Sequence, residues 1–289
     1  MKHVLSIDYE TFSDEPIKKA GLYRYIQSPV FEPLLCGYSI NGGPTLTLDL
    51  VTDADHRRFF RSDFARMLFS PEYEKHAWNA AFEIMASATC FNLPPENLRW
   101  FAEQWRDTML HARYCGLPGS LDGCGKALGL PEDKKKQAAG KALIRTFSVP
   151  RTPTARDPRA RVRPEDEPEK WNLFKEYNIQ DVVTESYIEN LLAPWPVPEF
   201  LQRQWVLDLV QNARGVGVDM TLVSGALRCA GDTNAALTAE AKELTGLENP
   251  NSTAQLLGWI KANYGEDALS TMDKTAVAEL MERVNEDDE

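Results

Sequence analysis

His3-Val-Leu-Ser-Ile-Asp-Tyr-Glu10 is an apolar run that ends in two acids. Its composition predicts a buried strand over residues 3–8. Residues two apart in a strand point to the same side, so Asp8 and Glu10 should converge while Tyr9, between them, faces the other way. Two converging carboxylates indicate a candidate functional site, although an Asp-x-Glu pair also occurs at ordinary strand ends.

Outward from this strand, strand patterns alternate with helix patterns. A turn at Asn41-Gly42-Gly43 should separate two of the strands. The further strands that we expect are 33–40, 45–50 and 74–77. The helices that we expect from apolar spacing are 54–69, 80–91, 120–129, 137–147 and 169–192. This mixture predicts an α/β domain in which a mixed sheet is flanked by helices.

The segment Ala193-Pro-Trp-Pro-Val-Pro198 is a stiff break. We therefore expect one domain at 1–193 and a small, all-helical one at 194–289. The helices expected in the second domain are 199–213, 221–244, 252–263 and 272–284.

Bulk composition limits the classes of protein to consider. The 289 residues carry a net charge of −11, which argues against a protein that coats DNA through a basic surface. No run of 18 apolar residues predicts a membrane span, and the N-terminus is too acidic for a secretory signal. The five cysteines are scattered without a CxxC pair, so we expect no zinc site, no disulfide framework and a cytoplasmic location.

Two further segments carry acids at element boundaries. Glu83 ends Asn79-Ala-Ala-Phe-Glu83, where a strand hands over to a helix. Its simpler interpretation is a charge that complements the helix N-terminus. Tyr177 and Asp181 lie four apart, on one face of the helix at 169–192. Their simpler interpretation is a solvated helix edge.

Together, these three segments resemble the motifs of the DEDD superfamily of 3′→5′ exonucleases. The order Asp8-Tyr-Glu10, Asn79-Ala-Ala-Phe-Glu83, Tyr177-Asn-Ile-Gln-Asp181 is similar to its tyrosine subtype. The histidine subtype would place a histidine where this chain has Glu176. The likeness extends over nearly the whole chain, to the exonuclease domain and the beginning of the polymerase region in phage and prophage family A DNA polymerases. The segments that carry this wider likeness include Asp107-Thr-Met109, Ala112–Leu121, Gly140–Ile144 and Gly215–Asp219.

The resemblance implies a ribonuclease H-like fold and a proofreading-type exonuclease that acts on the 3′ end of single-stranded DNA. It also implies two Mg²⁺ or Mn²⁺ ions. Asp8 would bridge both ions, Glu10 and Asp181 would complete the ion that holds the attacking water, and Glu83 would hold the second ion. Tyr177 would orient the nucleophile.

The resemblance also implies substrate contacts. Thr11 and Phe12 follow the first motif, where the family contacts the terminal nucleotide, and Asn79 is expected to contact the substrate too. Phe12 is equally typical of a core residue.

The chain departs from the family in two respects. The second motif usually ends in Asp and here ends in Glu83, which puts the geometry of one metal in doubt. The polymerase motifs are missing from this sequence, so no polymerase activity is expected, and a polymerase domain or subunit becomes a candidate partner.

Two other functions remain open at this stage. An exoribonuclease of the ribonuclease D type would use the same residues, and matched DNA and RNA oligonucleotides would distinguish it. A non-catalytic scaffold of a polymerase is kept open by Glu83, whereas the intact Asp8, Glu10, Tyr177 and Asp181 argue against it.

Residues 149–168 are rich in proline and arginine and predict a long loop. Lys126 to Arg163 holds eleven Lys and Arg against three acids. Because the loop precedes the helix that carries Tyr177, we expect Arg156, Arg159 and Arg161 to contact DNA. Val162 is the only apolar side chain larger than alanine from Arg151 to Arg163, so we expect the loop to be disordered without DNA.

Overall fold

A computed structural model describes residues 2–130, 138–155 and 157–287 of the chain. The chain forms two compact units, Met1–Gly215 and Val216–Glu289. The first unit is an α/β domain and holds all of the predicted site residues. Among the described residues, no helix is both long and apolar enough to cross a membrane.

A five-stranded mixed sheet forms the centre of the first unit, as expected. Its order is β3 (Leu46–Asp49), β2 (Glu32–Ile40), β1 (His3–Phe12), β4 (Tyr73–Ala77), β5 (Trp105–Asp107). β1 runs antiparallel to β2 and parallel to β4. The acids of the first motif therefore lie on a central strand, which has neighbours on both sides.

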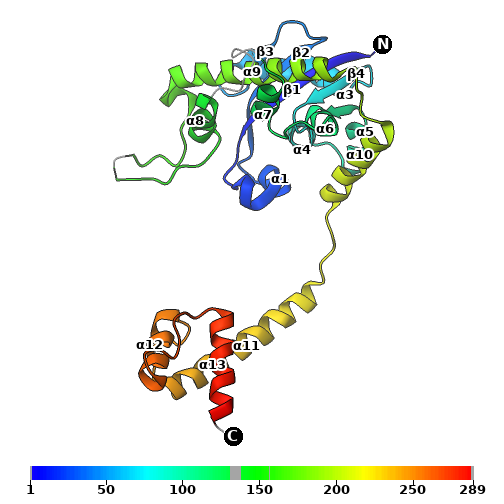
Figure 1. Cartoon of the computed structure of the whole chain (residues 1–289). Helices are drawn as coiled ribbons and strands as arrows, with labels where there is room; N and C mark the ends of the chain where they lie inside the picture. Colours follow the sequence, from blue (N-terminus) through cyan, green and yellow to red (C-terminus); the bar gives the residue numbers. More distant parts are fainter. Residues whose placement is uncertain (1, 131–137, 156, 288–289) are drawn as a thin grey trace. The chain divides into compact units, whose positions relative to one another are not determined.

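The two faces of β1 have different neighbours. Leu5, Ile7 and Tyr9 belong to a hydrophobic cluster with α3 (Ala65–Phe69), α4 (Ala81–Cys90), α5 (Leu98–Ala102) and α10 (Glu199–Arg214). The long helix α9 (Pro168–Leu192) crosses β1, β2 and β3 (Figure 1). The Ser186 hydroxyl lies 3.0 Å from that of Ser6, so α9 covers the face that the acids share. The predicted alternation along this strand is confirmed.

Several shorter elements complete the unit. They are α1 (Ile17–Gln27), α2 (Ala54–Phe59), the π-helical turn η1 (Phe60–Phe64), the 3₁₀ turns η2 (Pro95–Asn97) and η4 (Pro164–Asp166), α6 (Thr108–Tyr114), α7 (Leu121–Ala127) and α8 (Ala138–Phe147). Of these and the elements above, the sequence did not predict α1, α5, β5 or α6.

The first strand is longer than its apolar run suggested. β1 continues to Phe12, because Thr11 and Phe12 still pair with β2. The register shifts between Glu10 and Thr11, which is the mark of a β-bulge. The two acids therefore lie within the strand rather than at its end, and the bulge follows directly after Glu10.

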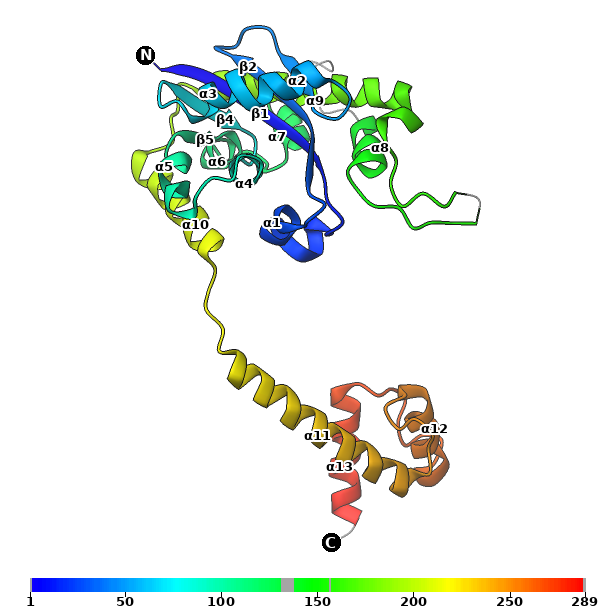
Figure 2. The ribbon, with the colours of Figure 1, turned by 180° about the vertical axis from the view of Figure 1, so that it is seen from behind.

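In the loop predicted at 149–168, the described residues 149–155 and 157–168 make several contacts, and disorder in the absence of DNA stays a prediction. Its two arms are joined by a hydrogen bond from Arg151 N to Ala160 O, and the arms extend away from α8 in both views (Figures 1 and 2). Val162 is 5% exposed and packs with Phe12 and Tyr177 in one cluster. Val162 and the Arg161–Glu32 ion pair are contacts between this loop and the rest of the first unit.

The structural division of the chain falls at 215/216 rather than at the expected 193/194. The reason is α10, which follows the proline-rich break but packs against the first unit. Its Val206 and Leu209 are buried in the main cluster, and the Gln202 amide donates to Trp105 O at 2.8 Å.

The second unit consists of α11 (Met220–Thr245), α12 (Thr253–Tyr264) and α13 (Lys274–Asp287). Neither α11 nor α12 has a buried residue. The hydrophobic clusters of the described residues have no member after residue 215.

Lys75 is a buried lysine in β4 whose ammonium donates to Ser70 O and to Gln104 Oε1, both at 2.7 Å. Burial lowers its pKa to about 7. Between that value and the pKa of an unfolded lysine, about 10.4, only the unfolded chain binds the proton. The free energy of unfolding should therefore rise as the pH rises through this window, by on the order of a few kcal/mol.

Denaturant unfolding from pH 6 to pH 10 measures this dependence. The rise should be flatter in Lys75→Met, because that variant has no proton to lose. Parallel curves for the two proteins would show that Lys75 keeps its ordinary pKa in the fold.

Candidate active site

Three carboxylates from two distant parts of the chain meet between β1 and α9. Asp8, Glu10 and Asp181 each offer an oxygen, and these three oxygens lie within 4.8 Å of one another. Glu10 is 8% exposed and Asp181 is 4% exposed, so the group is largely shielded from water. Like charges this close repel strongly unless a cation lies between them.

Glu83 lies beside this group, in the first turn of α4 and 4% exposed. Burial, and then the charge of Asp8, raises the pKa of Glu83 well above its usual value. Its Oε2 has no hydrogen-bond partner within the described residues. A buried carboxylate oxygen without a donor is costly, and a cation would compensate it. Glu83 is therefore near enough to Asp8 to feel its charge, and its role as a metal ligand stays a prediction.

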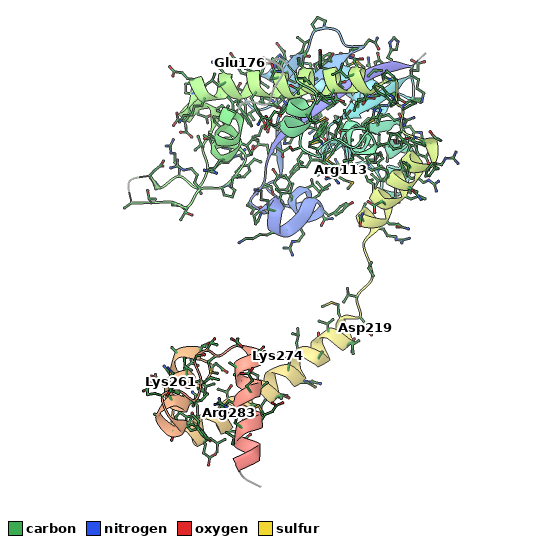
Figure 3. The ribbon with its side chains drawn as sticks, in the orientation of Figure 1. Arg113, Glu176, Asp219, Lys261, Lys274 and Arg283 are labelled. Carbon is green, nitrogen blue, oxygen red and sulfur yellow. The ribbon has the colours of Figure 1, made fainter. Side chains whose placement is uncertain are left out.

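Tyr177 is buried in α9, one turn before Asp181. Tyr177 is 4% exposed. Its ring stacks on that of Phe174, with 6.3 Å between the ring centroids and an interplanar angle of 12°. A Cβ on Gly140 would lie 1.9 Å from Tyr177 Cε2, so α8 approaches the ring as closely as a glycine allows. By contrast, Glu176 is exposed on the outer side of α9 (Figure 3).

A tight turn leads from β4 into α4 and the second motif. Asn79 has a left-handed backbone, with φ 61°, a conformation that asparagine tolerates better than most residues. Its backbone N–H donates to Asp107 Oδ1 at 3.0 Å, and the same oxygen caps α6 through Met109 N. The Asn79 side chain is exposed. Its predicted contact with a substrate stays a prediction.

Thr11 and Phe12, the other residues expected to contact a nucleotide, are buried in the free protein. The Thr11 hydroxyl lies 2.8 Å from the Tyr25 hydroxyl. The Arg161 guanidinium lies over the Phe12 ring, 3.6 Å from its centroid, and pairs with Glu32 at 2.6 Å. Contact between Phe12 and a nucleotide remains a prediction, and it requires Arg161 to move.

The arginines expected to bind DNA are paired within the molecule. Arg159 contacts Asp157 and Asp166, both at 2.8 Å. Ion pairs at exposed positions are weak, so phosphate groups could replace these acids at small cost. Arg156 lies outside the described residues.

Asn178 was not among the site residues that the sequence predicted. This residue is fully buried on α9, and its amide donates to Asp8 Oδ2 at 2.8 Å. Nothing in the motif spacing indicated it, because its contacts come from strands more than a hundred residues earlier.

The donor set fits a hard divalent cation. Carboxylate oxygens in this number are the ligands that Mg²⁺ and Mn²⁺ prefer, and no cysteine or histidine belongs to the group of three. The residues that would hold the ions are Asp8, Glu10, Glu83 and Asp181.

Glu83→Gln should raise the melting temperature in EDTA, because the change removes a buried carboxylate beside Asp8. Mn²⁺ should stabilise the wild-type protein more than this variant, since an ion that binds the folded protein more tightly raises its melting temperature further. Thermal melting across a Mn²⁺ titration measures both effects.

Glu185→Gln is the matched control, because Glu185 is a buried carboxylate of α9 that accepts from Thr108 instead. It should leave the Mn²⁺ effect unchanged. Equal Mn²⁺ stabilisation of wild type and Glu83→Gln would exclude Glu83 as a ligand.

Comparison with known proteins gives one close similarity in sequence. No protein-family model matches the chain. The chain is 43% identical over 284 residues to the DNA polymerase of Bacillus phage SP02, an alignment that covers 98% of this chain and 42% of that protein. The chain therefore spans less than half the length of this curated relative.

Similarities to solved structures are weaker. One is a structure described as the apo form of a nuclease, with a TM-score of 0.37 and 12% identity, covering 73% of this chain and 83% of that one. Another is the yeast NOT1 MIF4G domain co-crystallized with CAF1, with a TM-score of 0.39 and 13% identity, covering 68% and 82%. TM-scores this low do not establish a shared fold.

Proposed function

We propose that this chain is a metal-dependent 3′→5′ exonuclease of the tyrosine-subtype DEDD kind, with a ribonuclease H-like fold, acting on single-stranded DNA. The observation that carries the proposal is the meeting of Asp8, Glu10 and Asp181 within 4.8 Å. Asp181 is more than 170 residues from Asp8 and Glu10 in sequence, yet its carboxylate meets theirs between β1 and α9.

Two bound ions would activate a water molecule and stabilise the leaving 3′ oxygen. The protein's own contribution is to hold the ligands at fixed positions. Asp8 and Glu10 are fixed by the pleat of a central strand and Asp181 by a helix that packs across three strands. The Tyr177 ring is held by Phe174 and Gly140, and its hydroxyl would orient the attacking water.

The similarity to a phage DNA polymerase favours DNA as the substrate and proofreading as the role. The test is degradation of matched single-stranded DNA and RNA oligonucleotides that carry a 5′ label, with Mg²⁺, Mn²⁺ or EDTA. We expect a ladder shortened from the 3′ end of DNA, with either metal and not with EDTA. Faster loss of RNA would favour the exoribonuclease alternative, and no loss of either would favour the scaffold.

A polymerase polypeptide is the proposed partner of the second unit. Leu222, Leu237 and Leu244 of α11 are 70%, 58% and 73% exposed. At 100° per residue they lie within about 60° of one another, so they form one apolar stripe. The part of the phage polymerase that this chain does not match is a candidate to cover it. Hydrogen exchange of α11 should slow when that polypeptide is added, and unchanged exchange would contradict the proposal.

Arg159→Ser with Arg161→Ser should weaken DNA binding and flatten its salt dependence. Each arginine–phosphate contact on a single strand contributes about 0.7 to the log–log slope. The double variant should therefore lose up to about 1.4 from the slope, with the rate at saturating DNA nearly unchanged. Fluorescence anisotropy from low to moderate salt measures this.

Arg99→Ser is the control, because Arg99 also pairs with an acid, Glu103, but lies on α5. Its slope should equal that of wild type. If the double variant also keeps the wild-type slope, the loop arginines do not touch the phosphates.

A further inference from the structure

Three residues lie side by side on neighbouring strands beneath α9. In the register of the sheet, Asp8 on β1 pairs with Gly37 on β2, and Gly37 pairs with Thr47 on β3. Asn178 of α9 lies over the middle one of these three. It is 0% exposed, so its amide exchanges no hydrogen bonds with water.

The Asn178 amide connects the two outer residues. Its Nδ2 donates to Asp8 Oδ2 at 2.8 Å and to Asp8 O at 3.0 Å. Its Oδ1 accepts from the Thr47 hydroxyl at 2.6 Å. Because the carbonyl and carboxylate oxygens of Asp8 can only accept, the NH₂ end of the amide must face Asp8. The oxygen end then faces Thr47, whose hydroxyl can donate to it.

Gly37 supplies the room for this arrangement. A Cβ at position 37 would lie 2.7 Å from Asn178 Oδ1 and 3.0 Å from Val182 Cγ2. Gly37 has an ordinary extended backbone, which any residue can adopt. A glycine is therefore needed here to leave room for Asn178, and not to allow an unusual backbone conformation. A larger residue here would push the amide away from Asp8.

We propose that Asn178 is a positioning residue that sets the direction of the Asp8 carboxylate, with Thr47 and Gly37 as its supports. The inference rests on the proposed metal-dependent nuclease site, in which Asp8 is the shared ligand. A neutral amide suits this task, because it holds one carboxylate oxygen without adding charge to a cluster of acids. Partners of this kind typically change metal affinity 10- to 100-fold.

The test is the affinity for Mn²⁺, measured directly by calorimetry and separately from the rate. Asn178→Ala should raise the dissociation constant for Mn²⁺ by about 10- to 100-fold. Gly37→Ala should weaken Mn²⁺ in the same direction.

Ser39→Ala is the matched control, since Ser39 lies two residues after Gly37, is 2% exposed and donates to Gly43 O instead. It should leave the Mn²⁺ affinity unchanged. Thr47→Val should weaken Mn²⁺ in the wild-type background and have no further effect in Asn178→Ala, because Thr47 acts only through the amide. Melting curves show which variants fold. If Asn178→Ala does not fold, Thr47→Val still tests the proposal.

The outcomes distinguish a failure of the positioning role from a failure of the proposed function. If the wild-type protein neither binds Mn²⁺ nor degrades DNA, the proposed function fails. If wild type does both while folded Asn178→Ala and Thr47→Val keep its Mn²⁺ affinity, the positioning role is overturned and the nuclease assignment stands.

Discussion

Replacing Asp181 by alanine should lower the rate of DNA degradation at least about 1000-fold, because a lost metal ligand removes several kcal/mol of transition-state stabilisation. Asp8→Ala should have an effect of the same order. The fold should survive both changes, since each removes a charge from a repulsive group. Single-turnover degradation of a 5′-labelled strand measures the rate, and thermal melting without metal reports the fold.

Glu176→Ala is the control for Asp181→Ala, because Glu176 is an exposed carboxylate on the same helix. It should degrade DNA at the wild-type rate. Near-normal activity in a folded Asp181→Ala or Asp8→Ala protein would remove the carboxylates from the mechanism and leave the scaffold function as the better explanation.

Tyr177→Phe should lower the rate by roughly 10- to 1000-fold without abolishing it, because one orienting hydrogen bond contributes a few kcal/mol at most. The buried ring keeps its stacking on Phe174 in this variant, so the change isolates the hydroxyl. The half-saturating DNA concentration should change little. Rates equal within twofold would assign Tyr177 to packing alone.

Gly140→Ala tests the position of the same ring by another route. The new methyl group would overlap the ring, so either α8 or Tyr177 must shift. The variant should be slower and less stable than wild type, whereas Tyr177→Phe should be slower only. A fully active Gly140→Ala would mean that α8 yields and that the ring need not be held.

The sequence predicted most of the sheet and the helix with Tyr177, because apolar runs and helical spacing are strong there. It did not predict α1, which contains Gly21 at φ 79° and therefore has no continuous helical period. It did not predict β5, whose three residues form a strand only because they pair with β4. Elements that tertiary pairing creates leave little trace in local sequence.

The sequence predicted acids of the site, but it did not predict the residues that hold those acids in place. Of the four acids predicted as ligands, Asp8, Glu10 and Asp181 meet within 4.8 Å, and Glu83 is not a member of that group. The hydrogen bonds of Asn178 span 131 and 170 residues, so no local pattern could reveal them. In the loop at 149–168, the local composition likewise gave no sign that Val162 is buried against Phe12 and Tyr177.

The distance along the chain between β1 and α9 has a consequence for the order of folding. Asp8 and Asn178, which touch, are separated by 170 residues. Loop closure over such a span is costly and contacts of this kind form late. During synthesis, β1, β2 and β3 can pair long before α9 has left the ribosome. A nascent chain therefore carries acids on an open sheet but no assembled carboxylate group, and the capacity to bind metal arrives only when the last helix of the sheet layer docks.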